Sequence, residues 1–229
     1  MIDVGRIWRS SAGAKAVMAV SGMILFGFTV VHMLGNLNVF LGREAMNDYG
    51  AFLHEVPDLL LVTRVVLLTA LVAHVVTNIK LMQDSAKARP QAYKVVTPKG
   101  STLYSRTMRI SGPIVLTFIV LHLLNLTFHP VGKNWLHPDF RLQAGGHAPD
   151  AFHNLTTLLS QPLWGIFYVL ANLGLGLHLF HGAFAMFRSL GVSGDRQLGS
   201  ARMAATGLAV AVSGGNVLLA LAILVGLVK

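Results

Sequence analysis

AVMAVSGMILFGFTVVHMLGNL, at residues 16–37, is an apolar stretch that contains no Asp, Glu, Lys or Arg. A helix needs about 20 predominantly apolar residues to cross the hydrocarbon core of a bilayer, so this stretch is long enough to span a membrane. Four further predominantly apolar stretches lie at residues 58–80, 110–130, 163–187 and 203–228. The sequence therefore predicts an all-α integral membrane protein, with five transmembrane helices forming a single membrane domain over residues 1–229.

The composition agrees with this class. Of the 229 residues 54% are hydrophobic and 12% are charged, whereas a soluble domain is usually about a quarter charged. The absence of cysteine excludes disulfides, a thiolate nucleophile, an iron–sulfur cluster held by this chain and the attachment of c-type haem. The net charge of +9 comes from residues scattered between the apolar stretches, so we expect no nucleic-acid partner. The first apolar stretch is too long for a signal peptide and lacks an A-x-A cleavage site.

The distribution of Lys and Arg predicts the orientation in the membrane. Thirteen of these residues lie before the first stretch, between the second and third, or between the fourth and fifth, against five on the other side. Basic residues favour the cytoplasmic side. We therefore expect a multi-pass membrane protein, surrounded by lipid, with a cytoplasmic amino terminus and a carboxyl terminus outside.

The long loop at residues 131–162 falls on the predicted outer side. Its portion at 150–159 is typical of a short amphipathic helix lying on the outer surface. Four histidines lie in or beside this loop: His129, His137, His147 and His153. Their spacing matches no metal-ligand pattern, so we expect solvated loop histidines rather than a metal site.

Histidine also recurs inside the apolar stretches, at His32, His74, His122, His178 and His181. An ionisable side chain at membrane depth is costly and is a candidate functional residue. A single such histidine is explained by a hydrogen bond to a neighbouring helix, a common role of polar residues in membrane bundles. At least one histidine in each of the first four stretches instead predicts a shared site.

The depths of these histidines suggest two pairs. At 1.5 Å per residue, His32 and His122 lie about 25 and 20 Å from the nearest inner basic residue. His74 and His178 lie only about 9 and 15 Å from theirs. The first and third stretches thus place a histidine in the outer half of the membrane, and the second and fourth in the inner half. In an up-down bundle these stretches are diagonal neighbours, an arrangement that suits two bis-histidine haems.

An internal repeat supports the pairing. At an offset of 90 residues, Met, Ser, Gly, Ile, Phe, Val, His and Leu of the first stretch recur in the third, with His32 aligned on His122. At an offset of 104 the second and fourth stretches match more weakly, with His74 aligned on His178. We interpret the chain as a duplicated helix pair.

Two histidines of the fourth stretch compete for the inner site. Simple depth favours His181. The repeat favours His178, as do Gly174 and Gly182, which leave room for a porphyrin one turn away on either side. Small-residue packing between helices is the alternative explanation of these glycines. We expect His178 to be the ligand, with His181 contacting the haem edge, a propionate or a backbone carbonyl.

Three ordered motifs carry a family resemblance: KAVMAVSG at 15–22 followed by HMLGNL at 32–37, SRTMRISG at 105–112 followed by His122, and FY at 167–168 followed by HLFHG at 178–182. Together they resemble the single-chain cytochrome b subunit of bacterial succinate:quinone oxidoreductases, in its five-helix, two-haem form. The resemblance covers nearly the whole chain. At 184–188 this chain departs from the family's usual Trp-Ser and Phe-Gln, which affects local hydrogen bonds rather than ligation.

The resemblance implies a protein of the bacterial cytoplasmic membrane, an anchor for a flavoprotein that oxidises succinate and for an iron–sulfur subunit, both on the cytoplasmic side. Carried over by position, His32 and His122 would be axial iron ligands of an outer, distal haem b. His74 and His178 would be those of an inner, proximal haem b. The chain would be the electron-transfer and quinone-reactive subunit of succinate dehydrogenase, respiratory complex II of the tricarboxylic acid cycle, with menaquinone as the expected quinone. Its loops carry no flavin or dinucleotide fingerprint, so no residue here acts on succinate. The oligomeric state of the complex, a homo-oligomer included, stays open.

Two other functions fit the same histidines. The membrane cytochrome of a nitrate reductase, hydrogenase or formate dehydrogenase is also histidine-ligated, although the motifs of the first and fourth stretches argue against it. A small proton-coupled transporter would use the histidines as a relay, and it would be colourless. The direction of the reaction, succinate oxidation or fumarate reduction, is not encoded in these features.

Quinone reduction consumes two protons and needs an ionisable group with a route to water. His54 and Glu55 lie where the outer loop enters the second stretch. The resembling family often uses an acidic residue in this region for proton transfer, so Glu55 is the candidate. Asp58, just after Pro57, is better explained as an acid at a helix amino terminus. A competing inner site lies near Ser21, Arg106 and Arg109.

Overall fold

The computed structural model describes residues 8, 10–88, 103–128, 137, 139–144 and 148–229. Within these ranges the chain is helical, apart from turns, loops and one isolated β-bridge between Leu142 and Pro149. Five helices are long and apolar enough to cross a membrane: α2 (Ser11–Asn36), α4 (Pro57–Lys87), α5 (Leu103–Leu126), α7 (Pro162–Ser189) and α8 (Asp195–Leu224). The predicted all-α class is confirmed, each of the five predicted stretches lies in a helix long and apolar enough to span a membrane, and these helices suggest a multi-pass membrane protein.

Three of these helices, α4, α5 and α8, extend well beyond one end of the apolar stretches that predicted them. α4 continues past Lys80 to Lys87, and an ion pair between Lys80 and Asp84, one turn apart, supports the extension. α8 begins at Asp195, where the acid lies in the first turn and complements the positive end of the helix dipole. α5 begins at Leu103, seven residues before the predicted stretch, and ends at Leu126, four residues before the end of that stretch.

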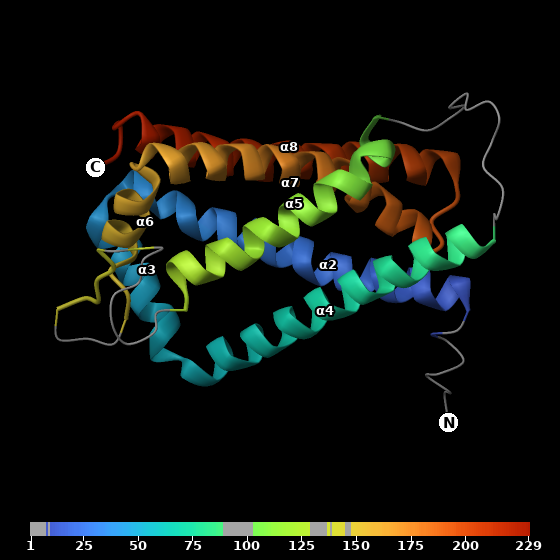
Figure 1. The fold of residues 1–229 in the computed structure, drawn as a ribbon, viewed down its shortest axis with the longest axis horizontal. Coiled ribbons are helices and arrows are strands. Elements are labelled where there is room, and N and C mark those ends of the chain that lie inside the picture. Colours follow the sequence, from blue (N-terminus) through green and yellow to red (C-terminus); the bar gives the residue numbers. More distant parts are fainter. Residues whose placement is uncertain (1–7, 9, 89–102, 129–136, 138, 145–147) are drawn as a thin grey trace.

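The five long helices lie roughly along one direction, and successive ones run in alternate senses (Figure 1). α7 packs against α8, α5 and α2, whereas α4 packs mainly against α2. One apolar cluster fills the space among α2, α7 and α8 and is formed by Met33, Leu175, Leu179, Ala209 and Val212. The backbones of α7 and α8 approach closely, since a Cβ atom at Gly176 would lie 2.6 Å from Ser213 Oγ.

Most of the surface of α4 is not covered by protein. Ala70 and Thr77 are its buried residues, whereas Leu61 and Leu68 are 61% and 64% exposed. Large exposed apolar side chains are unfavourable in water but are the normal surface of a helix that faces lipid. This surface therefore agrees with the membrane assignment made from length and composition.

A cap closes the end of the bundle at which α2 ends. It consists of the short 3-10 helix η1 (Leu37–Leu41), α3 (Arg43–Glu55) and α6 (Ala151–Leu159). α3 was not predicted, because the region after the first stretch was interpreted as a loop. The turn into α3 is made at Gly42, whose φ of 104° favours glycine.

α6 confirms the short helix predicted at 150–159, but its predicted position on the surface is wrong. Four of its apolar side chains are buried: Phe152, Leu155, Leu158 and Leu159. They form one cluster with Val39 of η1, Met46 of α3, and residues of α7 and α8. Asp150 is the N-cap of α6, and its side chain accepts a hydrogen bond from the His153 amide. α6 is thus a core element of the cap.

Asp150 also joins α6 to α3. Arg43 Nη1 lies 2.7 Å from Asp150 Oδ2, and Asn47 Nδ2 donates to Asp150 Oδ1 at 2.9 Å. Partial burial by itself would raise the pKa of Asp150. The hydrogen bonds from Asn47 and the His153 amide, with the positive charge of Arg43, outweigh that effect and hold this pKa below its ordinary value.

The prediction that the loop histidines are solvated is wrong for the two whose surroundings the structure describes. His137 is 1% exposed, and its Nε2 lies 2.7 Å from the Asn154 carbonyl oxygen. His153 Nε2 lies 3.0 Å from Asp139 Oδ2, and a hydrogen bond from Arg141 is the main cause that lowers the pKa of Asp139. His129 and His147 lie outside the described residues. Folding of the cap therefore binds these two histidines into its hydrogen-bond network.

Candidate functional site: two histidine pairs inside the bundle

Four of the five histidines at membrane depth form two close pairs. The ring centroids of His32 in α2 and His122 in α5 lie 5.7 Å apart. Those of His74 in α4 and His178 in α7 lie 6.3 Å apart. We call the first the cap-side pair, because α2 enters the cap shortly after His32, and the second the far-side pair. The structure thus brings together the residues that sequence depth had paired, and their role as iron ligands stays a prediction.

The two pairs lie at different depths in the bundle. On α2, Ser21 contacts the far-side pair, and His32 belongs to the cap-side pair. On α5, Ser111 likewise contacts the far-side pair, and His122 belongs to the cap-side pair. Each serine precedes its histidine by eleven residues, or about 16 Å of helix, so two helices independently give the same spacing between the pairs.

The separation within each pair fits an iron atom held between two imidazoles. A metal–imidazole bond of about 2 Å on each side, with roughly 1 Å from each nitrogen to its ring centre, puts the centroids about 6 Å apart. The observed 5.7 and 6.3 Å agree with that spacing. Among the described residues, no three His, Cys, Asp or Glu side chains gather to hold a metal ion. Two protein ligands for each iron suit haem, which supplies the other four nitrogens itself.

Hydroxyl groups contact the imidazoles at Nδ1. Ser21 Oγ lies 3.4 Å from His74 Nδ1, and Ser111 Oγ lies 3.4 Å from His178 Nδ1. Tyr168 Oη lies 3.4 Å from His122 Nδ1. A histidine that ligates a metal through one nitrogen normally uses the other for such a hydrogen bond, which fixes the orientation of the ring. In these three histidines Nε2 is the nitrogen that would be available to a metal.

Aromatic rings surround the cap-side pair and follow the internal repeat. Phe28 stacks on His32 with ring centroids 5.2 Å apart, and Phe118 lies 5.6 Å from His122. Each phenylalanine precedes its histidine by one helical turn. Tyr168 packs edge-on against Phe118 at 5.1 Å. These rings give the cap-side pair an apolar environment that an apolar macrocycle would share.

His178, rather than His181, lies against His74. A Cβ atom at Gly182 would meet nothing within 4 Å, so this glycine leaves space one turn from His178. A Cβ atom at Gly174 would lie 3.1 Å from Ile114 Cγ2, so that glycine serves the packing of α7 against α5. His181 is half-buried and belongs to neither pair.

An apolar groove lies between α2 and α4, next to the far-side pair. Its volume is about 520 Å³, within the range of roughly 300–1,000 Å³ usual for ligand sites. Ser21 and Ala73 line it. Ser21 contacts the His74 ring, and Ala73 directly precedes His74 in the sequence. Thr77, one turn after His74, is fully buried, and its Oγ1 has no hydrogen-bond partner among the described residues. The surroundings of the far-side pair are thus apolar, with hydroxyl groups close to His74.

The predicted quinone residues lie at the corner between α3 and α4. Glu55 is the last residue of α3, and both His54 and Glu55 are exposed. Pro57 is the first residue of α4 and Asp58 lies in its first turn, as predicted. The start of α4 is about 25 Å from His74 along the helix, and so roughly 9 Å beyond the level of the cap-side pair. The structure does not bring Glu55 into contact with that pair.

The residues of the competing inner site differ in their exposure. Ser21 is buried and points at His74, whereas Arg106 and Arg109 of α5 are exposed. Sequence reasoning therefore missed what Ser21 contacts, and it did not predict the contacts of Ser111 and Tyr168. The repeat at an offset of 90 held the signal for the serines, because it aligns Ser21 with Ser111 as well as the two cap-side histidines.

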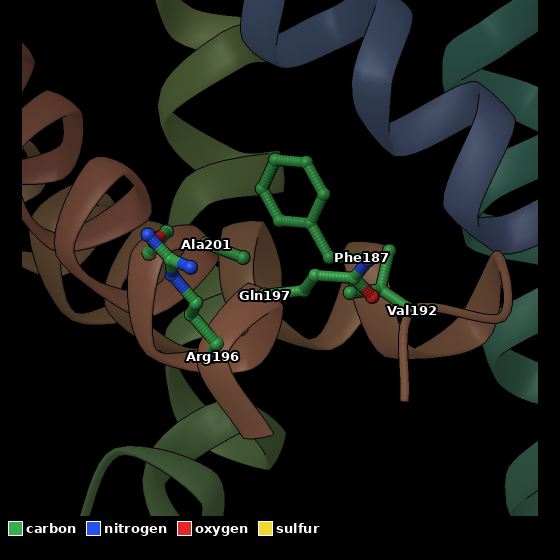
Figure 2. A pocket seen from close by; sticks show the side chains of 6 residues that line it. Phe187, Val192, Arg196, Gln197 and Ala201 are labelled. Atoms are coloured by element: carbon green, nitrogen blue, oxygen red, sulfur yellow. The ribbon is translucent and has the colours of Figure 1, made fainter. Parts of the chain in front are cut away.

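A second pocket of about 520 Å³ lies at the turn between α7 and α8 (Figure 2). Figure 2 shows the side chains that line it, among them Phe187 of α7 and Arg196 of α8. Phe187 is nine residues after His178, or roughly 14 Å along α7, so this pocket is separate from the far-side pair.

Comparison of the chain with protein-family profiles, with curated proteins and with solved structures found no match.

Proposed function

We propose that this chain is the di-haem b membrane anchor of a succinate:quinone oxidoreductase, which passes electrons from a flavoprotein and an iron–sulfur subunit to a quinone. The observation that carries the proposal is the pair of bis-histidine sites, with centroid separations of 5.7 and 6.3 Å, about 16 Å apart along the bundle. These sites support a di-haem membrane cytochrome. The choice of succinate as the electron donor rests on the resemblance of the ordered sequence motifs.

In this proposal the first four spans form an up-down haem-binding bundle. His32 and His122 would be the axial ligands of one haem b, and His74 and His178 those of the other. Haem b at each pair would supply one-electron transfer. The protein contributes the axial nitrogens, the hydroxyl groups that orient the rings, and an apolar environment that excludes water.

The orientation is also part of the proposal. The excess of Lys and Arg at the far side supports a cytoplasmic location for that side, where the partner subunits would dock. The far-side pair would then receive electrons first. The cap would lie outside the bacterial cytoplasmic membrane, above the cap-side pair.

A reduced-minus-oxidised visible spectrum of the purified chain tests the proposal. We expect the absorbance of two low-spin b haems per chain, reduced by succinate when the flavoprotein and iron–sulfur subunits co-purify. A colourless protein would favour the histidine-relay transporter. Two haems reduced through a partner without covalent or bound flavin would favour a cytochrome subunit of a hydrogenase, nitrate reductase or formate dehydrogenase.

Single substitutions test the pairing. His32→Ala and His122→Ala should each remove the same haem, because each removes one of its two axial ligands, and the other haem should keep its spectrum. His181→Ala is a matched control in the same membrane region. If His32→Ala removed the haem that depends on His74, the assignment of the pairs would be wrong.

A further inference from the structure

A serine followed by a glycine contacts each histidine of the far-side pair. Ser21-Gly22 of α2 faces His74 of α4, and Ser111-Gly112 of α5 faces His178 of α7. Both serines are nearly inaccessible, at 4% and 3% exposure. Because the two Ser-Gly steps are 90 residues apart, each half of the internal repeat supplies the same contact to the histidine of its next long helix.

The hydrogen bonds of Ser21 determine which atom donates to which. Its hydroxyl donates to the Val17 carbonyl at 2.8 Å and also lies 3.1 Å from the Met18 carbonyl. A hydroxyl has a single proton to donate, so toward His74 Nδ1 the serine oxygen acts as an acceptor. His74 therefore carries its proton on Nδ1, which leaves the lone pair of Nε2 directed away from α2.

The glycines set how closely the rings approach. A Cβ atom at Gly22 would lie 3.3 Å from His74 Cε1, a contact tight enough to displace the ring. At Gly112 the corresponding distance to His178 Cε1 is 4.0 Å, which is ordinary van der Waals contact. The backbone of α2 at Gly22 therefore lies closer to the His74 ring than the backbone of α5 at Gly112 lies to the His178 ring.

We propose that Ser21 and Ser111 are positioning residues that fix the tautomer and orientation of the His74 and His178 rings, so that both Nε2 atoms face the space between them. That a haem occupies the space between the two rings rests on the proposed function. A neutral imidazole protonated on Nδ1 is the form that ligates a metal through Nε2, and a hydrogen bond from Nδ1 makes the ligating nitrogen more basic. Ser21 has the stronger effect on the tautomer of its histidine, because its own hydroxyl proton is donated to the Val17 carbonyl of its helix.

The test compares Ser21→Ala and Ser111→Ala in the full-length purified protein. Thr29→Val is the matched control, since the Thr29 hydroxyl donates to the Leu25 carbonyl of the same helix. Ser21→Thr restores a hydroxyl at position 21. Two readouts are used: the reduction potential and low-spin electron paramagnetic resonance signal of each haem, and the ¹⁵N chemical shifts of the histidine ring nitrogens, which report the tautomer.

We expect Ser21→Ala to shift the potential of the far-side haem to a more positive value, because a less basic ligand favours ferric iron less. Its resonance signal should move as well. The cap-side haem and the Thr29→Val protein should keep wild-type values, Ser111→Ala should produce a smaller shift, and Ser21→Thr should return toward wild type. Unchanged potentials and signals in both alanine variants, or an equal shift in Thr29→Val, would overturn the inference.

The nitrogen spectra separate this inference from the proposed function. If the wild-type protein contains no haem, the function proposed above fails, but the Nδ1-protonated form of His74 should still be present and should be lost in Ser21→Ala. An Nε2-protonated His74 in the wild-type protein without haem would refute the role of Ser21 whatever the function is.

Discussion

Replacing Asp150 with alanine should release α6 from the rest of the cap. The substitution removes an N-cap, which is worth about 1 kcal/mol. It also removes the hydrogen bond from Asn47 at 2.9 Å to a charged carboxylate, worth about 1.5 kcal/mol. The pair with Arg43 adds less than about 1 kcal/mol, because the Arg43 side chain is 55% exposed. Together these losses come to about 3 kcal/mol, which is roughly a hundredfold in a local opening equilibrium.

Hydrogen exchange of the backbone amides at 151–159, followed by mass spectrometry, measures that equilibrium. We expect exchange in Asp150→Ala to be about a hundredfold faster than in the wild-type protein, and about fivefold faster at most in Arg43→Ala. Asp48→Ala, which removes an exposed acid from α3, should leave the rate unchanged. An acceleration in Asp150→Ala no larger than that in Arg43→Ala would refute the N-cap and Asn47 contributions.

Three further predictions concern pH, the choice of ligand and quinone reduction. The pKa of Asp150 is held below its ordinary value of 3.8, so its contribution to cap stability is present above that pH and is lost as the pH falls through the lowered pKa. Hydrogen exchange corrected for intrinsic rates should show this loss of stability at low pH, and Asp150→Asn should reduce the pH dependence. His178→Ala should remove one haem from the visible spectrum, whereas His181→Ala should keep both, because only His178 of the two is paired with His74 at 6.3 Å. Glu55→Gln should leave both haem spectra and dye-linked succinate oxidation intact but slow quinone reduction by about a hundredfold, the effect usual for loss of a proton donor; an unchanged quinone turnover would eliminate Glu55.

The spans were predictable because their signal is local. A run of apolar residues of bilayer length needs no knowledge of its neighbours, and all five runs are helices. The ends were less predictable, since polar residues continue α4 to Lys87 and begin α8 at Asp195. α3 was missed for the same reason: with charged residues along its length, it carries no hydropathy signal. Gly42 before it and Glu44 in its first turn were the available indications of a helix start.

The pairing of the histidines could be predicted from the sequence, but the contacts that orient their rings could not. The depth of a residue in a straight helix follows from its distance along the sequence, and these depths paired His32 with His122 and His74 with His178. The groups that orient the rings were not accessible, because a contact such as Tyr168 to His122 depends on the rotation of two helices about their axes. The burial of His137 depends on a carbonyl in α6, a contact that spacing within a loop does not encode.

The contacts between helices have a consequence for the order of assembly. α2 packs with α4, and α5 packs with α7, so each half of the repeat is a helical hairpin that can enter the bilayer by itself. Each histidine pair takes one ring from each hairpin, and α4 has little other contact with the second hairpin. A group bound between the rings would therefore act as a cross-link between two independently inserted halves. The apoprotein should insert with all five spans, yet leave α4 free to separate from α7, and proteases should distinguish it from the holoprotein at the connections of that helix.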